Sequence, residues 1–318
     1  MNITVIGPGR WGTFIAEYLS EIGNDVILYG RRFSKSLELL KQSRGNDTVK
    51  LNDGVILSDD VSVVRGRDVI VISIASQNLR ELCREIKPFL TEMTGIVLCM
   101  KGLEVGSGKR LTEIVSEELG NSVKTAVWVG PGHPQEFVRG VPNCMVIDSL
   151  DNEFTRCLAD RFSSRLIRFY YGTDLIGSEI GAASKNVIGI AAGMLDGLQM
   201  SSLKGALMAR GTREIARLIE AEGGNGISAY GLCHLGDYEA TVFSEFSHNR
   251  KFGMCLVRGE DYGMLAEGAF TSDAILTLAG KHSVDLPICR AVYDVIYNDK
   301  SAEETLKELF LRSIKNEF

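Results

Sequence analysis

The sequence predicts an α/β first half, built on a doubly wound parallel sheet, followed by an all-helical second half. Three observations support this prediction. Short apolar runs alternate with amphipathic helical patterns up to residue 172, a glycine-rich turn directly follows the first run, and helical spacing alone continues after residue 172. We therefore expect two domains, residues 1–172 and 173–318, each large enough to bury a core.

Composition narrows the class of protein. With 35 basic and 41 acidic residues, the net charge of −6 disfavours nucleic acid or an anionic membrane as the main partner. The seven cysteines form no Cys-x-x-Cys pair and mostly lie in apolar runs, which indicates free thiols in a reducing compartment. The first residues are typical of a strand and a turn, not of an export signal. We expect a cytoplasmic location.

The first elements predict a dinucleotide site. Residues 3–6 form an apolar strand, Gly7-Pro8-Gly9-Arg10-Trp11-Gly12 follows, a helix runs to residue 22, and residues 25–29 form a second strand. In such a unit one glycine makes the tight turn, the next admits a pyrophosphate, and the third lets helix and strand pack closely. Gly7, Gly9 and Gly12 therefore predict a Rossmann-type cofactor turn.

The end of the second strand indicates which cofactor binds. A carboxylate there would accept the ribose 2′-hydroxyl of NAD, but the sequence reads Gly30-Arg31-Arg32 and has no acid before Glu38. Two arginines favour the 2′-phosphate of NADP. NADP is the preferred prediction, and NAD binding beside a solvated arginine pair is the alternative.

Further apolar strands are predicted at residues 69–74, 96–100, 126–130, 144–147 and 166–171, with helices at 76–86 and 109–119. Ligands of such sheets bind beyond the carboxyl ends of the strands. Those ends carry Ser76, Lys101 and the turn Gly130-Pro131-Gly132-His133-Pro134, which we expect to converge on one crevice. For His133 a structural turn role and an acid or base role stay open.

The central helix of the second half is unusual because residues 180–195 contain a single charge, Lys185. A buried, unpaired ammonium costs several kcal/mol, so this lysine needs a partner, must lose its proton, or faces a cavity. Small residues form a stripe around it, which favours the cavity, whereas a structural ion pair or a snorkelling side chain stays open. Lys185 and Asn186 make the helix too polar to span a membrane. Other helices are predicted at residues 203–222, 266–282, 287–297 and 301–314.

Taken together, the motifs resemble NAD(P)-dependent glycerol-3-phosphate dehydrogenase along the whole chain. They include GPGRWGT at 7–13, KGLE at 101–104, GPGHPQE at 130–136, GAASKNVIGIAAGMLDGL at 181–198, GDYEAT at 236–241 and HNRKFG at 248–253. The resemblance implies reversible hydride transfer between NAD(P)H and dihydroxyacetone phosphate, which gives sn-glycerol 3-phosphate for phospholipid synthesis. It also implies a helical domain like the C-terminal domain of 6-phosphogluconate dehydrogenase.

The resemblance further implies roles for individual residues. Lys185 matches the catalytic lysine, with Lys101 and Asp237 beside it. The implied substrate residues are Lys101, Gly130, Gly132, Asn186, Thr241, Ser247, His248, Asn249 and Arg250. The implied cofactor residues are Gly7, Gly9, Arg10, Trp11, Gly12, Arg31, Arg32, Ser76, Lys101, Pro134, His248, Leu265 and Glu267.

Two departures from the family pattern concern the same site. His248 replaces the first arginine of the family's Ser-Arg-Asn-Arg motif, and His133 follows Gly132 where small residues are usual. Guanidinium binds phosphate bidentately, whereas imidazole offers one donor at a time and titrates near ~6.5. We expect weaker or pH-dependent phosphate binding, or a transfer of that task to Arg250.

The mechanism expected from these residues is proton donation by Lys185 to the substrate oxygen, with Asp237 holding the amine. No metal is expected, because the four histidines are scattered. Two alternatives remain: a related NADP-dependent reductase of another small ketone or β-hydroxyacid, and a catalytically inactive NADP-binding sensor. A homodimer is compatible with the apolar helical half.

Overall fold

A computed structural model describes residues 1–91 and 93–313. The chain forms two compact units. The first comprises Met1–Lys101 and Arg110–Glu179, and the second comprises Gly102–Lys109 and the chain from Ile180 onward. The second unit therefore begins inside helix α7 (Leu175–Gly197) and includes a loop from the first half of the sequence.

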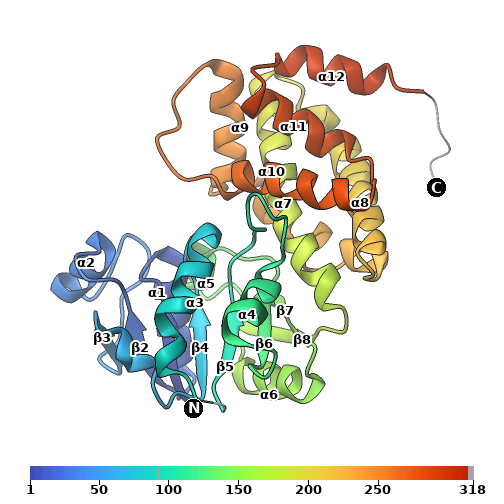
Figure 1. Cartoon of the computed structure of the whole chain (residues 1–318). Coiled ribbons are helices and arrows are strands. Elements are labelled where there is room, and N and C mark those ends of the chain that lie inside the picture. The colour runs from blue at the N-terminus through green and yellow to red at the C-terminus, as the bar shows by residue number, and fades with distance from the viewer. Residues whose placement is uncertain (92, 314–318) are drawn as a thin grey trace. The chain divides into compact units, whose positions relative to one another are not determined.

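The first unit contains a sheet that, within the described residues, has eight strands in the order β3-β2-β1-β4-β5-β6-β7-β8 (Figure 1). The strands are β1 (Asn2–Ile6), β2 (Asp25–Tyr29), β3 (Val55–Ser58), β4 (Val69–Ile72), β5 (Gly95–Leu98), β6 (Thr125–Val129), β7 (Asn143–Ser149) and β8 (Ile167–Tyr171). Strands β1 to β6 are parallel, and their order is that of a doubly wound dinucleotide-binding sheet. The strand order reverses between β1 and β4, so a ligand is expected beyond the carboxyl ends of these two strands.

One strand pair corrects the prediction of a parallel sheet. Strand β7 pairs antiparallel with β6, and β8 then runs parallel to β7. The connection between β6 and β7 contains only the single-turn helix α5 (Pro134–Phe137). A parallel pair needs a longer crossover, usually with a full helix, so the chain turns back and enters β7 from the end where β6 stops.

The remaining helices of this unit are α1 (Arg10–Glu21), α2 (Lys35–Ser43), α3 (Leu79–Ile86), α4 (Leu111–Leu119) and α6 (Asn152–Phe162). Sequence patterns predicted α1, α3 and α4 but not α2, α6 or strand β3. The predicted start of α3 at Ser76 is a 3₁₀ turn, Ser76–Asn78, because the chain tightens before the α-helix begins.

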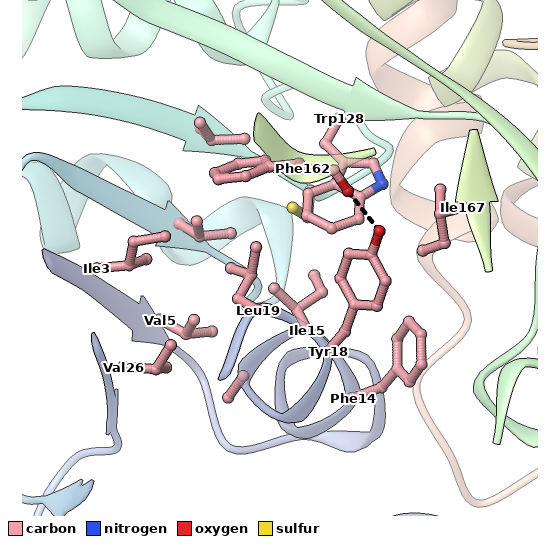
Figure 2. Packing of buried hydrophobic residues seen from close by; sticks show 14 of the residues in the cluster. Ile3, Val5, Phe14, Ile15, Tyr18, Leu19, Val26, Trp128, Phe162 and Ile167 are labelled. Carbon is pink, nitrogen blue, oxygen red and sulfur yellow. Dashed lines mark hydrogen bonds between the residues drawn. The ribbon is translucent and has the colours of Figure 1, made fainter. Parts of the chain in front are cut away.

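The core of the first unit lies against α1 (Figure 2). Phe14, Ile15, Tyr18 and Leu19 are buried on one face of α1, at helical spacing. The Tyr18 hydroxyl donates a hydrogen bond to the backbone oxygen of Phe162, which satisfies a polar atom inside the apolar cluster. Burial raises the pKa of Tyr18 to about 12, so this hydroxyl stays a donor at neutral pH.

The second unit is helical in its described part. It contains most of α7, then α8 (Lys204–Ala221), α9 (His248–Arg258), α10 (Glu267–Lys281), α11 (Pro287–Tyr297) and α12 (Ala302–Phe310) (Figure 1). The sequence did not predict α9, and α12 ends at Phe310; its predicted end at Ile314 lies outside the described residues. Ser301 caps α12 by accepting the backbone N–H of Glu304, as the capping box predicts. None of the helices in the described ranges has the length and apolar character that a membrane crossing needs.

Glycines of α7 and α9 serve close packing. A Cβ on Gly193 would lie 1.9 Å from the backbone oxygen of Arg250, and a Cβ on Gly253 of α9 would lie 2.1 Å from that of Ile190. A Cβ on Gly189 would lie 2.7 Å from Thr241 Cγ2. The glycines therefore let α9 and the segment before it approach the α7 backbone.

All seven cysteines are free thiols. Cys83, Cys99, Cys233 and Cys289 are buried, as their apolar surroundings predicted. Cys157 is exposed and so is not a core thiol, because it lies on the solvent side of α6.

Candidate active site

The glycine turn after β1 has the geometry of a pyrophosphate site. Gly7 has φ +112°, and a Cβ there would lie 2.1 Å from the backbone oxygen of Ser73, which follows β4. A Cβ on Gly12 would lie 1.9 Å from the Gly7 oxygen, whereas one on Gly9 would meet nothing within 4 Å. The first and third glycines thus permit close packing, and the middle one leaves space beside the N-terminus of α1, where an anion is favoured. These residues fit a dinucleotide.

Two neighbours of this turn are held within the first unit. The Trp11 ring packs against Phe14 and Phe137, with ring centroids 5.4 and 6.1 Å apart. Arg10 forms an ion pair with Asp47, with 3.5 Å between Nη2 and Oδ2. Both side chains are only partly buried, which leaves the face of the turn accessible.

Arg31 and Arg32 follow β2 and are exposed. The Arg31 guanidinium lies 3.0 Å from Glu81 Oε1, and Tyr29 donates a hydrogen bond to Glu85 beside it. Arg32 lies over the Phe33 ring, 5.2 Å from its centroid. The two predicted 2′-phosphate ligands therefore lie at the carboxyl end of β2, next to acids that would compete with an anion for Arg31.

The carboxyl ends of β5 and β6 meet through Lys101. Its Nζ donates a 2.7 Å hydrogen bond to the backbone oxygen of Gly130, so these two predicted strand ends converge. Gly130 and Gly132 both have positive φ, and a Cβ on Gly132 would clash with the Phe137 ring. Ser76 is buried after β4, and Pro134 is the buried first residue of α5.

Lys185 is buried on α7 and has an anionic partner. Its Nζ lies 2.8 Å from Asp237 Oδ2 and donates a 2.7 Å hydrogen bond to Thr241 Oγ1. Thr241 in turn donates to the backbone oxygen of Asp237, 2.8 Å away. Of the possibilities left open for this lysine, the structure shows a buried ion pair, with the ammonium fixed by a carboxylate and a hydroxyl.

Asn186, the next residue of α7, is part of an amide chain. Asn249 Nδ2 donates to Asn186 Oδ1 at 3.0 Å, and Gly268 N donates to Asn249 Oδ1 at 2.9 Å. This chain ties α7, α9 and α10 together. Glu267 is the first residue of α10, and Leu265 before it is half-exposed.

The start of α9 carries the remaining predicted residues. Ser247 caps the helix by accepting the Arg250 backbone N–H, which is a structural task. The His248 Nδ1 lies 2.5 Å from the Tyr262 hydroxyl. Arg250 Nε donates to Asp196 Oδ2 at 2.5 Å, and Lys204 pairs with the same carboxylate. Arg250 is therefore held by a carboxylate of α7, which does not favour the expectation that it took over phosphate binding.

Comparisons with known proteins agree with this arrangement. Family models of the NAD-dependent glycerol-3-phosphate dehydrogenase N-terminus and C-terminus match residues 2–155 and 174–307. A glycerol-3-phosphate dehydrogenase [NAD(P)+] from Moorella thermoacetica is 36% identical, covering 98% of this chain and 96% of the relative. One from Syntrophomonas wolfei is 33% identical, covering 99% and 96%. The crystal structure of glycerol-3-phosphate dehydrogenase from Coxiella burnetii is similar with a TM-score of 0.92 and 29% identity, covering 98% of this chain and 99% of that one.

The chain belongs to the NAD-dependent glycerol-3-phosphate dehydrogenase family. It is an NAD(P)-dependent dehydrogenase with a Rossmann-like sheet and a helical C-terminal part, as the sequence predicted. Within the described ranges, no group of three or more His, Cys, Asp and Glu side chains is arranged to hold a metal ion.

Sequence reasoning missed one positioning network of this dehydrogenase. His234 Nδ1 donates to the Gly181 oxygen at 2.8 Å, so Nε2 accepts from the Tyr238 hydroxyl at 2.6 Å. Burial lowers the pKa of His234 to about 4, which keeps the ring neutral. The network fixes the segment that carries Asp237 and Thr241 against α7. Its only sequence signal was the pairing of His234 with Tyr238 at helical spacing.

Two further contact residues, Tyr262 and Asp196, were not indicated by any sequence pattern. Tyr262 reaches His248 from the loop between α9 and α10, and Asp196 reaches Arg250 from the last turn of α7. Both contacts depend on how the helices pack. Spacing along the sequence therefore could not predict them.

Proposed function

We propose that this chain catalyses the reversible transfer of hydride between NAD(P)H and dihydroxyacetone phosphate, giving sn-glycerol 3-phosphate for phospholipid synthesis. The observation that supports it most is the buried Lys185 ammonium, oriented by Asp237 and Thr241 and followed by Asn186 on the same helix. A buried lysine held in one orientation is suited to moving a proton at a fixed point.

The cofactor, when bound, supplies the hydride that the ketone carbon of the substrate receives. The chain supplies the matching proton: Lys185 Nζ donates it to the carbonyl oxygen, which becomes the new hydroxyl, and takes it back in the reverse direction. Asp237 keeps the amine in place, and Thr241 fixes its direction by bonding to the Asp237 backbone.

Other residues are assigned to substrate binding as part of this proposal. The Asn186–Asn249 amide pair would hydrogen-bond the substrate hydroxyl or carbonyl, and the N-terminus of α9, with His248 and Asn249, would take the phosphate. Lys101, Gly130 and Gly132 would line the substrate from the sheet. Gly7, Gly9, Gly12, Arg31 and Arg32 would hold the cofactor, with NADP preferred and NAD accepted.

Three broader assignments belong to the same proposal. Residues 1–172 would bind the dinucleotide and 173–318 would complete the substrate site. Seven free thiols support a cytoplasmic location. A homodimer is proposed from the apolar character of the helical half.

The test follows NADPH absorbance with the purified chain and dihydroxyacetone phosphate, with unphosphorylated dihydroxyacetone as the matched control and NADH in parallel. We expect oxidation with the phosphorylated ketone, a much lower kcat/KM with the control, and faster turnover with NADPH than with NADH. Equal rates with both ketones would contradict the assigned substrate.

His248 favours a second candidate, reduction of a small ketone without phosphate. The imidazole replaces a guanidinium fork and is already within 2.5 Å of the Tyr262 hydroxyl, so this position offers less charge to a phosphate. The same assay with a panel of unphosphorylated α-hydroxy and β-hydroxy ketones identifies this activity if dihydroxyacetone phosphate is not reduced.

A further inference from the structure

The second unit contains a groove that the proposed reaction does not use. It has a volume of about 800 Å³ and is lined by residues of α7, α8, α11 and α12 and of the segments that adjoin them. None of the described residues that line the groove is assigned above to cofactor or substrate binding. The volume lies in the range of pockets that hold small molecules.

One part of the groove is apolar. Three helices contribute long aliphatic side chains that point into it. They are Met194 of α7 with Leu198 directly after its end, Leu207 of α8, and Leu306 and Leu309 of α12. A channel with such walls favours a hydrocarbon chain, because each buried methylene contributes about 0.8 kcal/mol.

The face of α8 that lines the groove changes character along the helix. Leu203, which precedes the helix, and Ala206 and Leu207 are apolar, whereas Arg210, Arg213 and Arg217 follow at helical spacing on the same face. At a rise of 1.5 Å per residue, the distance from Leu203 to Arg217 is about 21 Å. One end of the groove is therefore hydrophobic and the other cationic, over a length that suits an extended long-chain acyl group.

The acids in the lining are already engaged. Asp285 forms an ion pair with Arg312, and its backbone oxygen accepts from Arg217. Glu214 accepts the backbone N–H groups of Ile288 and Cys289 at 2.9 Å, so it caps α11. With four arginines against two carboxylates, the cationic end carries an excess of positive charge.

We propose that this groove binds a single-chain lipid with an anionic head group, the acyl chain lying along α7 and α12 and a carboxylate or phosphate head bound by the α8 arginines. Guanidinium forks bind either head group bidentately. A second copy of the chain fits less well, because a two-fold contact would place the same arginine cluster on both partners. The assignment does not depend on the reaction proposed above.

The test is equilibrium binding of radiolabelled palmitate, below its micellar concentration, to the full chain. We expect saturable binding of one molecule per chain. Ala206→Trp fills the apolar end from an exposed position, and Arg213→Glu reverses the charge at the other end; each should weaken binding at least tenfold. Arg258→Glu, an exposed arginine on α9 outside the groove, is the matched control and should leave binding unchanged. Thermal unfolding checks that each variant is folded.

Competition distinguishes the head groups and the occupants. Displacement by palmitoyl lysophosphatidate, but not by methyl palmitate, would support an anionic head and show that phosphate is accepted; resistance to lysophosphatidate would restrict the site to a carboxylate. Absence of saturable binding, equal competition by the neutral ester, or undiminished binding to Ala206→Trp would each overturn the proposal. So would sedimentation showing that Ala206→Trp dissociates a dimer of this chain while palmitate affinity is retained.

Discussion

Single side chains decide the chemistry proposed for this dehydrogenase, and Asp237 is the one that most directly fixes Lys185. Asp237→Asn keeps the shape of the side chain but removes the charge that holds the ammonium. A displacement of the amine by about 1 Å can cost about 10²-fold in rate. We expect kcat to fall by about that factor with little change in the KM for NADPH. An unchanged kcat in a variant that binds NADPH normally would contradict the positioning role.

His248 offers a second test at the level of one residue. His248→Arg places a permanent charge and a bidentate donor at the start of α9, so the KM for dihydroxyacetone phosphate should fall. Steady-state kinetics between pH 6 and 8 measure this. A KM that is identical in the two proteins at each pH would mean that His248 does not face the substrate phosphate.

Helices position these residues, and α7 and α9 pack closely against each other. Gly253→Ala would place a Cβ 2.1 Å from the Ile190 oxygen, so the helices must separate. We expect a loss of about 1–3 kcal/mol in the free energy of unfolding and reduced activity, because Asn186 and Asn249 lie on these two helices. Gly205→Ala, where a Cβ meets nothing within 4 Å, is the control and should gain about 0.5–1 kcal/mol. Urea unfolding compares the two, and equal stabilities would contradict this account of the glycines.

The sequence predicted some elements well because their residues are locally consistent. The glycine turn and β1–α1–β2 follow from spacing, and the apolar run around Lys185 identifies α7. Strand β3 and helices α2, α6 and α9 were missed. Strand β3 has only four residues, and α9 has Gly253 as its only fully buried residue, so neither shows a clear core-facing pattern. Strand β7 was predicted, but its antiparallel direction was not, because strand direction is set by the connection and not by the strand's own residues.

The candidate site also has features that the sequence could predict and features that it could not. Which residue types are present, Lys185, Asn186 and Asp237 among them, could be predicted. Thr241 and Asn249 were also implied, but the side chains that they contact, and the contact of Tyr262 with His248, depend on the folded backbone. The structure shows the ion pair between Lys185 and Asp237 that the resemblance implied.

For the whole molecule, two buried groups in the helical unit should control how stability depends on pH. Burial raises the pKa of Glu214 from 4.5 to about 7, against the two backbone N–H groups that it accepts. The folded state then binds the Glu214 proton more tightly than the unfolded chain does. The resulting contribution of Glu214 to the free energy of unfolding is complete below about pH 4.5 and is lost as the pH rises to about 7. Burial lowers the pKa of His234 from 6.5 to about 4, so its contribution is full above about pH 6.5 and is lost as pH falls. As the pH rises from about 4.5 to 6.5, the stabilising contribution of Glu214 decreases while that of His234 increases.

Replacing Glu214 should leave the pH dependence of stability that comes from His234. Glu214→Gln should gain stability relative to the wild type as pH rises from 4.5 to 7, by about 3 kcal/mol over the window. Urea unfolding at several pH values measures the difference between the two proteins. A difference that does not change with pH would show that Glu214 does not titrate as its burial requires.

The central claim is that Lys185 supplies the proton that completes hydride transfer, and single-turnover oxidation of NADPH with dihydroxyacetone phosphate tests it most directly. Lys185→Ala should lower the rate at least ~10²-fold while NADPH binding, followed by fluorescence, stays near that of the wild type. Lys251→Ala, an exposed lysine of α9, should retain the wild-type rate. A Lys185→Ala variant that binds NADPH and turns over at nearly the wild-type rate would contradict the account.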